Sequence, residues 1–185
     1  MPKVSDEHLE ARREQILEGA RRTFARHGYE GATVSRLEEE IGLSRGAIFN
    51  YFPDKWSLFF ELASQDQHEL TTLLIEQGLD ATIRHLTKEN PDWMAVYFEV
   101  LRRLRGNPKL MKEFHTRGGE GREEQVKAWL EQLHASGTVR NDVTLEDVAN
   151  FVNVVANGIV LATSLGLELD AEALLKLVHH GLDPE

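Results

Sequence analysis

Helical periodicity runs through almost the whole chain and is interrupted only at short turns. In EARREQILEGARRTFARHG, the apolar residues Ile16, Leu17, Ala20 and Phe24 recur at helical spacing, and Gly28 then follows as a helix stop. No segment alternates apolar and polar residues over a useful strand length. The pattern therefore predicts an all-α protein with about nine helices.

The predicted helix boundaries are marked by residues that cap helix ends. Ser, Thr, Asp and Asn side chains accept hydrogen bonds from the first backbone N–H groups of a helix. Asn followed by Pro, at 90–91 and 107–108, is a further start signal, and GGEG at 118–121 predicts a kink or break. The candidate N-caps are Thr33, Ser44, Asp54, Asn90, Asn107, Thr144 and Asp170.

The first 53 residues contain three short helical stretches, and the tight turn IGLS joins the second to the third. Two helices joined by a turn that contains glycine form a helix-turn-helix unit. Gly42 suits this turn because a left-handed residue without Cβ lets the helices meet at a steep angle. The predicted core of the unit is Ile16, Ala20, Phe24, Val34, Leu37, Ile41, Leu43, Ile48 and Phe52.

The third stretch, SRGAIFNYF, has a buried face defined by Ile48 and Phe52, which lie four residues apart. Gly46 costs about 1 kcal/mol in a helix relative to alanine, and close approach to a DNA backbone is one reason to tolerate it. Arginine and asparagine reach phosphates and base edges, free N–H groups at a helix start bind phosphate, and Lys55 just beyond suits a phosphate contact. The residues predicted to point outward or sideways are Ser44, Arg45, Ala47, Asn50 and Tyr51.

The net charge of −10 at first opposes nucleic-acid binding, for which a basic face is expected. The charge is uneven, however, because residues 1–57 carry nine basic and ten acidic side chains, whereas residues 58–185 carry twelve and twenty-one. The acidity therefore belongs to the C-terminal two-thirds. The basic residues available to face one way are Arg12, Arg13, Arg21, Arg22, Arg26, Arg36, Arg45 and Lys55.

The segment ILEGARRTFARHGYEGATVSRLEEEIGLSRGAIFNYFPDKWSLF resembles the DNA-binding domain of TetR/AcrR-type transcriptional repressors. HGYEGATV, IGLSRGAIFNYF and DKWSLF follow the family's order and spacing, and EGATVSRLEEEIGLSRGAIF with the later DWM is similar to aconitase-type repressors of actinobacteria. Asn50–Tyr51 departs from the family, where many members carry Tyr or His followed by His or Tyr, so the base preference stays open. The resemblance implies DNA contacts by Thr33, Arg36, Ser44, Arg45, Gly46, Ala47, Phe49, Asn50, Tyr51 and Lys55.

The family architecture implies a DNA-binding domain over residues 1–53 and a helical effector-binding and dimerisation domain over residues 54–185. The last two long helices would then pair with their copies in a homodimer. The sequence agrees independently, because FVNVVANGIVLATSLG is apolar nearly all round and needs cover on more than one side. Its amides and its length at the lower limit for a membrane span favour a buried helix over a membrane segment. We therefore expect a cytoplasmic protein without membrane contact.

Candidate effector residues lie in the C-terminal two-thirds, each with an ordinary alternative. The aromatic stripe after Asn90 either lines an effector pocket or forms plain core. Arginines and a histidine in the next helices either bind an anionic effector or are solvated surface, and two asparagines four apart either face a ligand or bond across a dimer. The candidates are Trp93, Met94, Tyr97, Phe98, Leu101, Arg102, His115, Asn153 and Asn157, with Arg103, Arg105, Arg117 and Arg122 as further cations.

Other classes of site have little support in the sequence. There is no cysteine, and the adjacent pair His179–His180 points about 100° apart on a helix without a partner at ligand spacing, so no metal is expected. No paired acid and base motif or nucleophile elbow is present, so we expect neither an enzyme nor a cofactor.

Two functions remain, with a third class beside them. The first is a dimeric repressor that binds a palindromic operator on double-stranded DNA and is released by a small-molecule effector. The alternative is a helical module for small molecules or proteins, with a degenerate helix-turn-helix that does not read DNA. A constitutive regulator without an effector is the third class.

Overall fold

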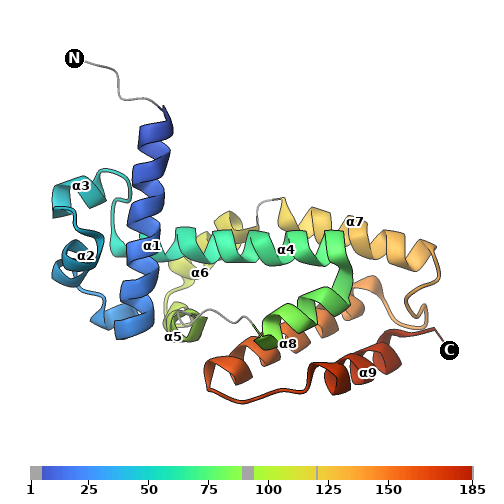
Figure 1. The fold of residues 1–185 in the computed structure, drawn as a ribbon. Helices are drawn as coiled ribbons and strands as arrows, with labels where there is room; N and C mark the ends of the chain where they lie inside the picture. The colour runs from blue at the N-terminus through green and yellow to red at the C-terminus, as the bar shows by residue number, and fades with distance from the viewer. Residues whose placement is uncertain (1–5, 89–93, 120, 185) are drawn as a thin grey trace.

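The computed structural model describes residues 6–88, 94–119 and 121–184, and all regular structure within these ranges is helical. The described ranges contain nine helices, which confirms the predicted all-α fold. Figure 1 shows α1 to α3 grouped at one end, with the other helices forming an elongated body. The helices are α1 (Asp6–Gly31), α2 (Val34–Ile41), α3 (Arg45–Phe49), α4 (Lys55–Lys88), α5 (Met94–Leu104), α6 (Pro108–Gly119), α7 (Arg122–Ala135), α8 (Leu145–Ser164) and α9 (Ala171–Leu182).

The three N-terminal helices enclose one apolar core. The predicted face of α1 is buried, and Leu37 on α2 and Ile48 on α3 are each 0% exposed. Val34 and Leu43 were predicted in the same core but are only half-buried. Burial of the others stabilises the unit because each apolar side chain removed from water contributes about 1.5–3 kcal/mol.

The turn between α2 and α3 has the predicted geometry. Gly42 has a φ of 75°, and its N–H donates to the Glu38 carbonyl at 2.9 Å, which closes the C-terminus of α2. A residue with a Cβ is strained in this left-handed conformation. Thr33 and Ser44 then cap the starts of α2 and α3, as predicted.

Helix α4 connects the two ends of the molecule. Asp54 caps its start by accepting a hydrogen bond from the Ser57 N–H at 2.7 Å. The helix then runs from α1 into the middle of the body (Figure 1). Gly78, with a φ of 84°, breaks it where the sequence predicted a helix end, and a second helical segment follows directly. Movement of α4 would therefore act on both ends of the molecule.

The capping signals in the C-terminal part are also present in the structure. Thr144 and Asp147 form the predicted capping box of α8, and Asp170 accepts from two N–H groups at the start of α9. Asn107 accepts from the Leu110 N–H at 3.2 Å. Gly121 separates α6 from α7 within the predicted break, whereas the predicted cap at Asn90 lies outside the described residues.

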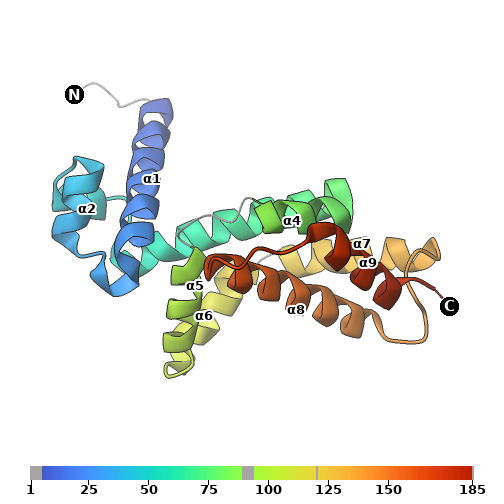
Figure 2. The ribbon, with the colours of Figure 1, turned by 60° about the horizontal axis from the view of Figure 1, so that its bottom comes forward.

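Helices α8 and α9 leave large apolar side chains in water. Val154 is 71% exposed, and Leu165 and Leu177 are each 70% exposed. Both helices lie along the same edge of the body (Figures 1 and 2). Helix α8 is long and apolar enough to cross a membrane by those two criteria alone, with a mean hydropathy of 1.3. Its exposed amides and the acidic residues of its first turn suit a protein partner better.

Candidate functional site

The ten residues predicted to contact DNA lie between the start of α2 and the start of α4. The exposed members lie in the first turn of α2 and at the two ends of α3, which sits at the outer end of the molecule (Figure 1). A helix of this kind, held from behind by its apolar face, can enter a major groove. The exposed members are Thr33, Arg36, Ser44, Arg45, Gly46 and Asn50, and the half-buried ones are Ala47, Phe49, Tyr51 and Lys55.

Two of these polar side chains also cap helices. Thr33 Oγ1 accepts from the Arg36 N–H at 3.5 Å, and Ser44 Oγ accepts from the Ala47 N–H at 3.4 Å. Both bonds are long, so each hydroxyl keeps a lone pair and its proton for a phosphate or a base. The caps fix where α2 and α3 begin, and thereby which side chains face outward.

Arg45 is the exposed cation of α3. Its backbone N–H donates to Glu38 Oε1 at 2.6 Å, which ties the start of α3 to α2. Its guanidinium carbon lies 5.8 Å from the centre of the Phe49 ring, and none of the described carboxylates forms an ion pair with it. The guanidinium is therefore oriented by an aromatic face yet keeps its donors for an external acceptor.

Two other cations of the set are held by backbone carbonyls. Arg36 Nη1 donates to the Gly31 carbonyl at 2.8 Å. Lys55 Nζ donates to the Tyr29 carbonyl at 2.6 Å and lies 4.4 Å from the centre of the Tyr29 ring. Burial lowers the pKa of Lys55, and the nearby Glu99 carboxylate partly opposes that shift. Hydrogen bonds to backbone carbonyls near the end of α1 therefore fix the positions of both cations, of which Arg36 is exposed and Lys55 half-buried.

The predicted common basic face is smaller than the sequence indicated. Arg13 pairs with Glu61 on α4, and Arg21 donates two hydrogen bonds to the buried Asp66 on α4, at 2.7 and 2.9 Å. The spacing of Arg13 and Arg21 in the sequence did not show that the side of α1 that carries them faces α4. In the same way, Glu40 of α2 accepts hydrogen bonds from Arg22 and Arg26 of α1. These bonds lower the pKa of the Glu40 carboxyl.

The aromatic stripe on α5 is mostly core. Met94 and Tyr97 are buried, at 8% and 9% exposed, while Phe98 and Leu101 are half-buried against the core. The Tyr97 hydroxyl accepts from Gln67 Nε2 at 2.9 Å, and burial raises its pKa. Most of the stripe is therefore packed core. Its one polar group, the Tyr97 hydroxyl, points to α4, so a role in effector binding stays a prediction for that residue.

The remaining effector candidates lie elsewhere. Arg102, Asn153 and Asn157 are exposed, and Asn157 Nδ2 donates to the Asn153 carbonyl at 2.8 Å. These three side chains therefore lie on the surface, whereas Tyr97 is buried. Trp93 and the side chain of His115 lie outside the described residues.

One face of α4 carries polar atoms that sequence reasoning missed. Trp56, Phe60, Ser64 and Gln67 recur at helical spacing, and the Phe60 ring meets Phe114 of α6. Within the described part of the chain, Trp56 Nε1 and Ser64 Oγ are buried without a hydrogen-bond partner. Buried polar groups are rarely left unpaired, so this face is a candidate site for a polar ligand. The four-residue spacing was visible in the sequence, but the missing partners were not.

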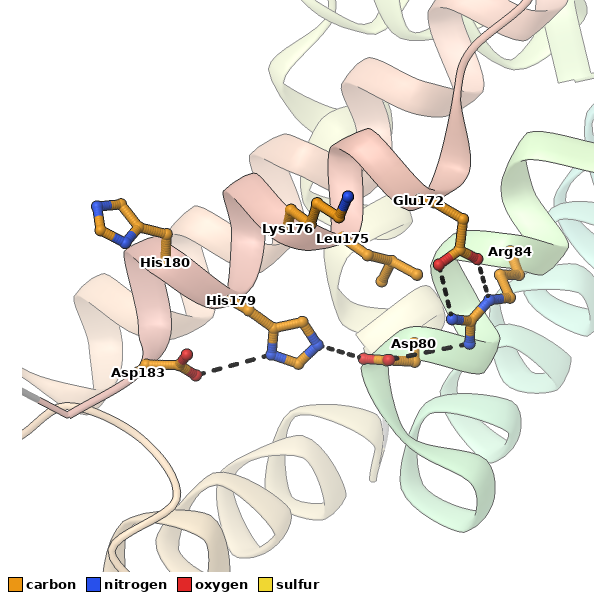
Figure 3. A pocket seen from close by; sticks show the side chains of 8 residues that line it. All are labelled: Asp80, Arg84, Glu172, Leu175, Lys176, His179, His180 and Asp183. Carbon is orange, nitrogen blue, oxygen red and sulfur yellow. Dashed lines mark hydrogen bonds and ion pairs between the residues drawn. The ribbon is translucent and has the colours of Figure 1, made fainter.

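A second feature is a polar hollow of about 400 Å³ between α4 and α9 (Figure 3). His179 Nε2 lies 2.7 Å from Asp80 Oδ1, and Arg84 binds Glu172 through Nε at 2.8 Å. His179 has a second carboxylate nearby, because its Nδ1 lies 3.7 Å from Oδ1 of Asp183, one turn further along α9, so the expectation that no local carboxylate stands at a suitable spacing was wrong. Asp80, Arg84, Glu172, His179 and Asp183 pair with one another, and the described residues contain no group of three metal ligands. We interpret the hollow as a tie between α4 and α9.

Another hollow, of about 350 Å³, lies between α4 and α7. It is lined by polar side chains and by three apolar ones, Ile75, Ala128 and Trp129. Nothing in the sequence pointed to it, because its two sides are about fifty residues apart in the chain. It is a further candidate for small-molecule binding.

The sequence of this chain matches known families of bacterial regulators. Residues 16–62 match the model of bacterial regulatory proteins of the tetR family, and residues 74–184 match the C-terminal domain of BetI-type transcriptional repressors. The chain is 41% identical over 178 residues to the HTH-type transcriptional repressor AcnR of Corynebacterium jeikeium, covering 94% of each protein. It is 39% identical over 168 residues to the HTH-type transcriptional repressor Rv1474c of Mycobacterium tuberculosis, covering 90% of this chain and 89% of that protein.

Solved structures give the same fold. GusR of Salmonella enterica aligns with a TM-score of 0.76 at 20% identity, covering 97% of this chain and 98% of that one. The fatty acid degradation regulator FadR of Bacillus halodurans aligns with a TM-score of 0.71 at 18% identity, covering 97% and 95%. The comparisons confirm the resemblances described above, including that to aconitase-type repressors, and the expectation of a regulator rather than an enzyme.

Proposed function

Because the chain belongs to the TetR family of bacterial transcriptional regulators, we propose that it represses transcription as an effector-controlled homodimer on a palindromic operator. Residues 1–53 form the DNA-binding domain in this proposal, and residues 54–185 bind the effector and dimerise. The observation that carries it is the exposed surface of α3, where Arg45, Gly46 and Asn50 stand outward from a closed apolar core. The protein would act in the cytoplasm, where its DNA lies.

The backbone of α3 is open to close approach. A Cβ built on Gly46 would meet no atom within 4 Å, so packing inside this chain does not require a glycine there. A glycine still costs about 1 kcal/mol in a helix. A DNA backbone lying against this surface would supply the reason for Gly46, with Ser44 and Arg45 beside it as phosphate or base contacts.

The exposed faces of α8 and α9 are the proposed dimer interface. Val154, Leu165 and Leu177 together would leave an apolar patch in water, and a second copy would cover it. A Cβ on Gly158 of α8 would also meet nothing within 4 Å in the chain, so a partner helix can approach there. A two-fold dimer presents two copies of α3 to two half-sites of an inverted repeat.

The effector is proposed to enter beside α4. The unpaired Trp56 Nε1 and Ser64 Oγ offer hydrogen bonds to a polar ligand, and the Gln67–Tyr97 pair lies on the same side. A ligand that favours a different position of α4 would change the separation of the two α3 helices. A coupling of about 1–3 kcal/mol would weaken operator binding 5- to 150-fold.

The test is selection of genomic DNA fragments by the purified protein at low salt, followed by affinity measurements on the selected site. We expect one inverted repeat, bound with steep salt dependence because phosphate contacts release counterions. Arg45→Ala should lower the affinity by about 1–3 kcal/mol. Arg105→Ala removes the same charge from an exposed position outside the helix-turn-helix and should leave the affinity unchanged.

The alternative makes the opposite prediction. If the helix-turn-helix is degenerate, the protein enriches no sequence above background, and Arg45→Ala behaves like Arg105→Ala. Repeating the selection with a metabolite extract distinguishes that case from a repressor that needs a co-ligand. A constitutive regulator would select a repeat but show no release by any fraction of the extract.

A further inference from the structure

The backbone of Tyr29 is a meeting point of three helices. Its N–H donates to Glu99 Oε2 of α5 at 3.0 Å, and its carbonyl accepts from Lys55 Nζ at the start of α4 at 2.6 Å. Its ring stacks on Phe24 with ring centres 5.8 Å apart. The two peptide groups that flank the Tyr29 Cα are therefore held by α5 and α4, which both contact the N-terminal unit.

The Tyr29 N–H needs an acceptor because Gly28 breaks α1. Gly28 has a φ of 68° and a ψ of 176°, so the turn after it is a new helical start. The first N–H groups of a helical start have no acceptor in their own helix. Glu99 supplies one from another part of the chain. A Cβ on Gly28 would lie 3.0 Å from Glu99 Oε2, so glycine also provides the space for this carboxylate.

A second contact joins the same segments. Arg103, one turn after Glu99 on α5, forms an ion pair with Glu30, and its guanidinium carbon lies 5.9 Å from the centre of the Tyr29 ring. Two neighbouring residues of the turn, Tyr29 and Glu30, are thus bound to two residues of α5. The turn then leads within a few residues to Thr33, the cap of α2.

We propose that Glu99 is a positioning residue for DNA binding: it caps the turn after Gly28 from α5 and so fixes the helix-turn-helix on the effector-binding body. The proposal rests on the DNA-binding function proposed above. Glu99 itself lies on α5, two residues after Tyr97, whose hydroxyl accepts a hydrogen bond from Gln67 on the α4 face that also carries Trp56 and Ser64. A ligand that shifts α5 there would withdraw the carboxylate from Tyr29, which gives effector binding a direct path to α2.

The first measurement is hydrogen exchange in the full-length protein. Glu99→Ala removes the acceptor, and we expect faster exchange in the peptide that spans residues 29–33. Glu99→Gln keeps an acceptor oxygen and should retain most of the protection. Glu124→Gln and Glu124→Ala make the same changes at an exposed position on α7 and should leave this peptide unchanged. Exchange unaffected by Glu99→Ala would overturn the inference even if the protein binds no DNA.

The second measurement is operator affinity as a function of salt. Loss of a cap is expected to weaken binding roughly 2- to 30-fold in Glu99→Ala, with partial recovery in Glu99→Gln. The slope of log affinity against log salt should match wild type, because no phosphate contact is lost. Lys55→Ala should instead lower the slope by about 0.9.

Three results contradict the positioning role. These are an unchanged affinity in Glu99→Ala, a lowered slope in that variant, and equal losses in Glu99→Ala and Glu124→Ala. Failure of wild-type protein to select any operator, both without and with the metabolite extract, would refute the proposed function, and with it the effect on DNA. The exchange experiment would then still report whether Glu99 caps the turn.

Discussion

The N-terminal unit and the α8–α9 edge differ in how far they bury their apolar side chains. In the first, Ile16, Leu37 and Ile48 are each 0% exposed, so α1, α2 and α3 bury their shared apolar core within one chain. In the second, Val154 and Leu177 are 71% and 70% exposed. The N-terminal unit therefore closes its apolar core within one chain, whereas the α8–α9 edge leaves apolar side chains in water, where the proposed dimer would cover them.

The N-terminal unit and the rest of the chain also differ in charge. The first 57 residues are nearly neutral, and many of their arginines are bound to carboxylates, as in Arg21 with Asp66. Arg45 keeps its guanidinium without an ion pair among the described residues. The strongly acidic remainder disfavours DNA, so an operator would be held at one end only.

Truncation inside the N-terminal core should have the largest effect. Ile48→Ala leaves a cavity beneath α3, and we expect a loss of about 2–5 kcal/mol in the free energy of unfolding. Urea unfolding followed by circular dichroism measures this loss. Leu177→Ala at low protein concentration is the matched control and should cost much less, because Leu177 is exposed in the single chain. Similar losses in both variants would contradict the comparison.

A charge on the exposed edge should separate the dimer with little effect on the fold. Val154→Asp places a carboxylate in the proposed interface, and we expect the dimer dissociation constant to rise by at least about tenfold, or roughly 1.4 kcal/mol. Sedimentation equilibrium measures the change. Leu9→Asp, on an exposed apolar residue of α1, should leave the dissociation constant unaltered. An unchanged dimer in Val154→Asp would place the interface elsewhere.

The smallest expected effect is a shift in tyrosine ionisation, with one tyrosine on each side of the comparison. Burial raises the pKa of Tyr29 in the N-terminal unit and of Tyr97 in the body. The folded state therefore favours the neutral phenol, and the associated stability is present below about pH 10 and lost as the pH rises through the folded pKa values. Absorbance titration of native protein should show both ionising above their values in urea.

Single substitutions assign these two ionisations. Tyr97→Phe should remove one late step from the native titration, and Tyr29→Phe the other. Tyr51→Phe should leave both late steps in place. If either single variant still showed two late steps, the assignment of these steps to the buried phenols of Tyr29 and Tyr97 would be wrong.

Local features of the fold were predictable from the sequence. Helix starts at Thr33, Ser44, Asp54 and Thr144, and the turn at Gly42, all appear where capping and turn residues stand. These signals act over three or four residues, so they can be read along the chain. The surface of α3 was predictable for the same reason, since Ile48 and Phe52 define its buried side.

Contacts between distant segments were not predictable. The partners Asp80 and His179 are 99 residues apart, and Tyr29 and Glu99 are 70 apart. The effector candidates show the limit most clearly, because Tyr97 is buried whereas Asn153 and Asn157 face outward. Each choice depends on how helices cross, and helical periodicity alone does not specify that.

The amino-acid sequence by itself determined the helices, their ends and the helix-turn-helix, because capping, glycine conformation and apolar spacing act within a few residues. The tertiary structure decided which charges remain free for a partner, which apolar face stays uncovered, and how Glu99 reaches Tyr29. Those outcomes depend on side chains that meet only after the chain has closed long loops. The physical reason is that the residues packed against a charge or an apolar surface decide whether it is paired, buried or left exposed, and these residues come from distant parts of the chain.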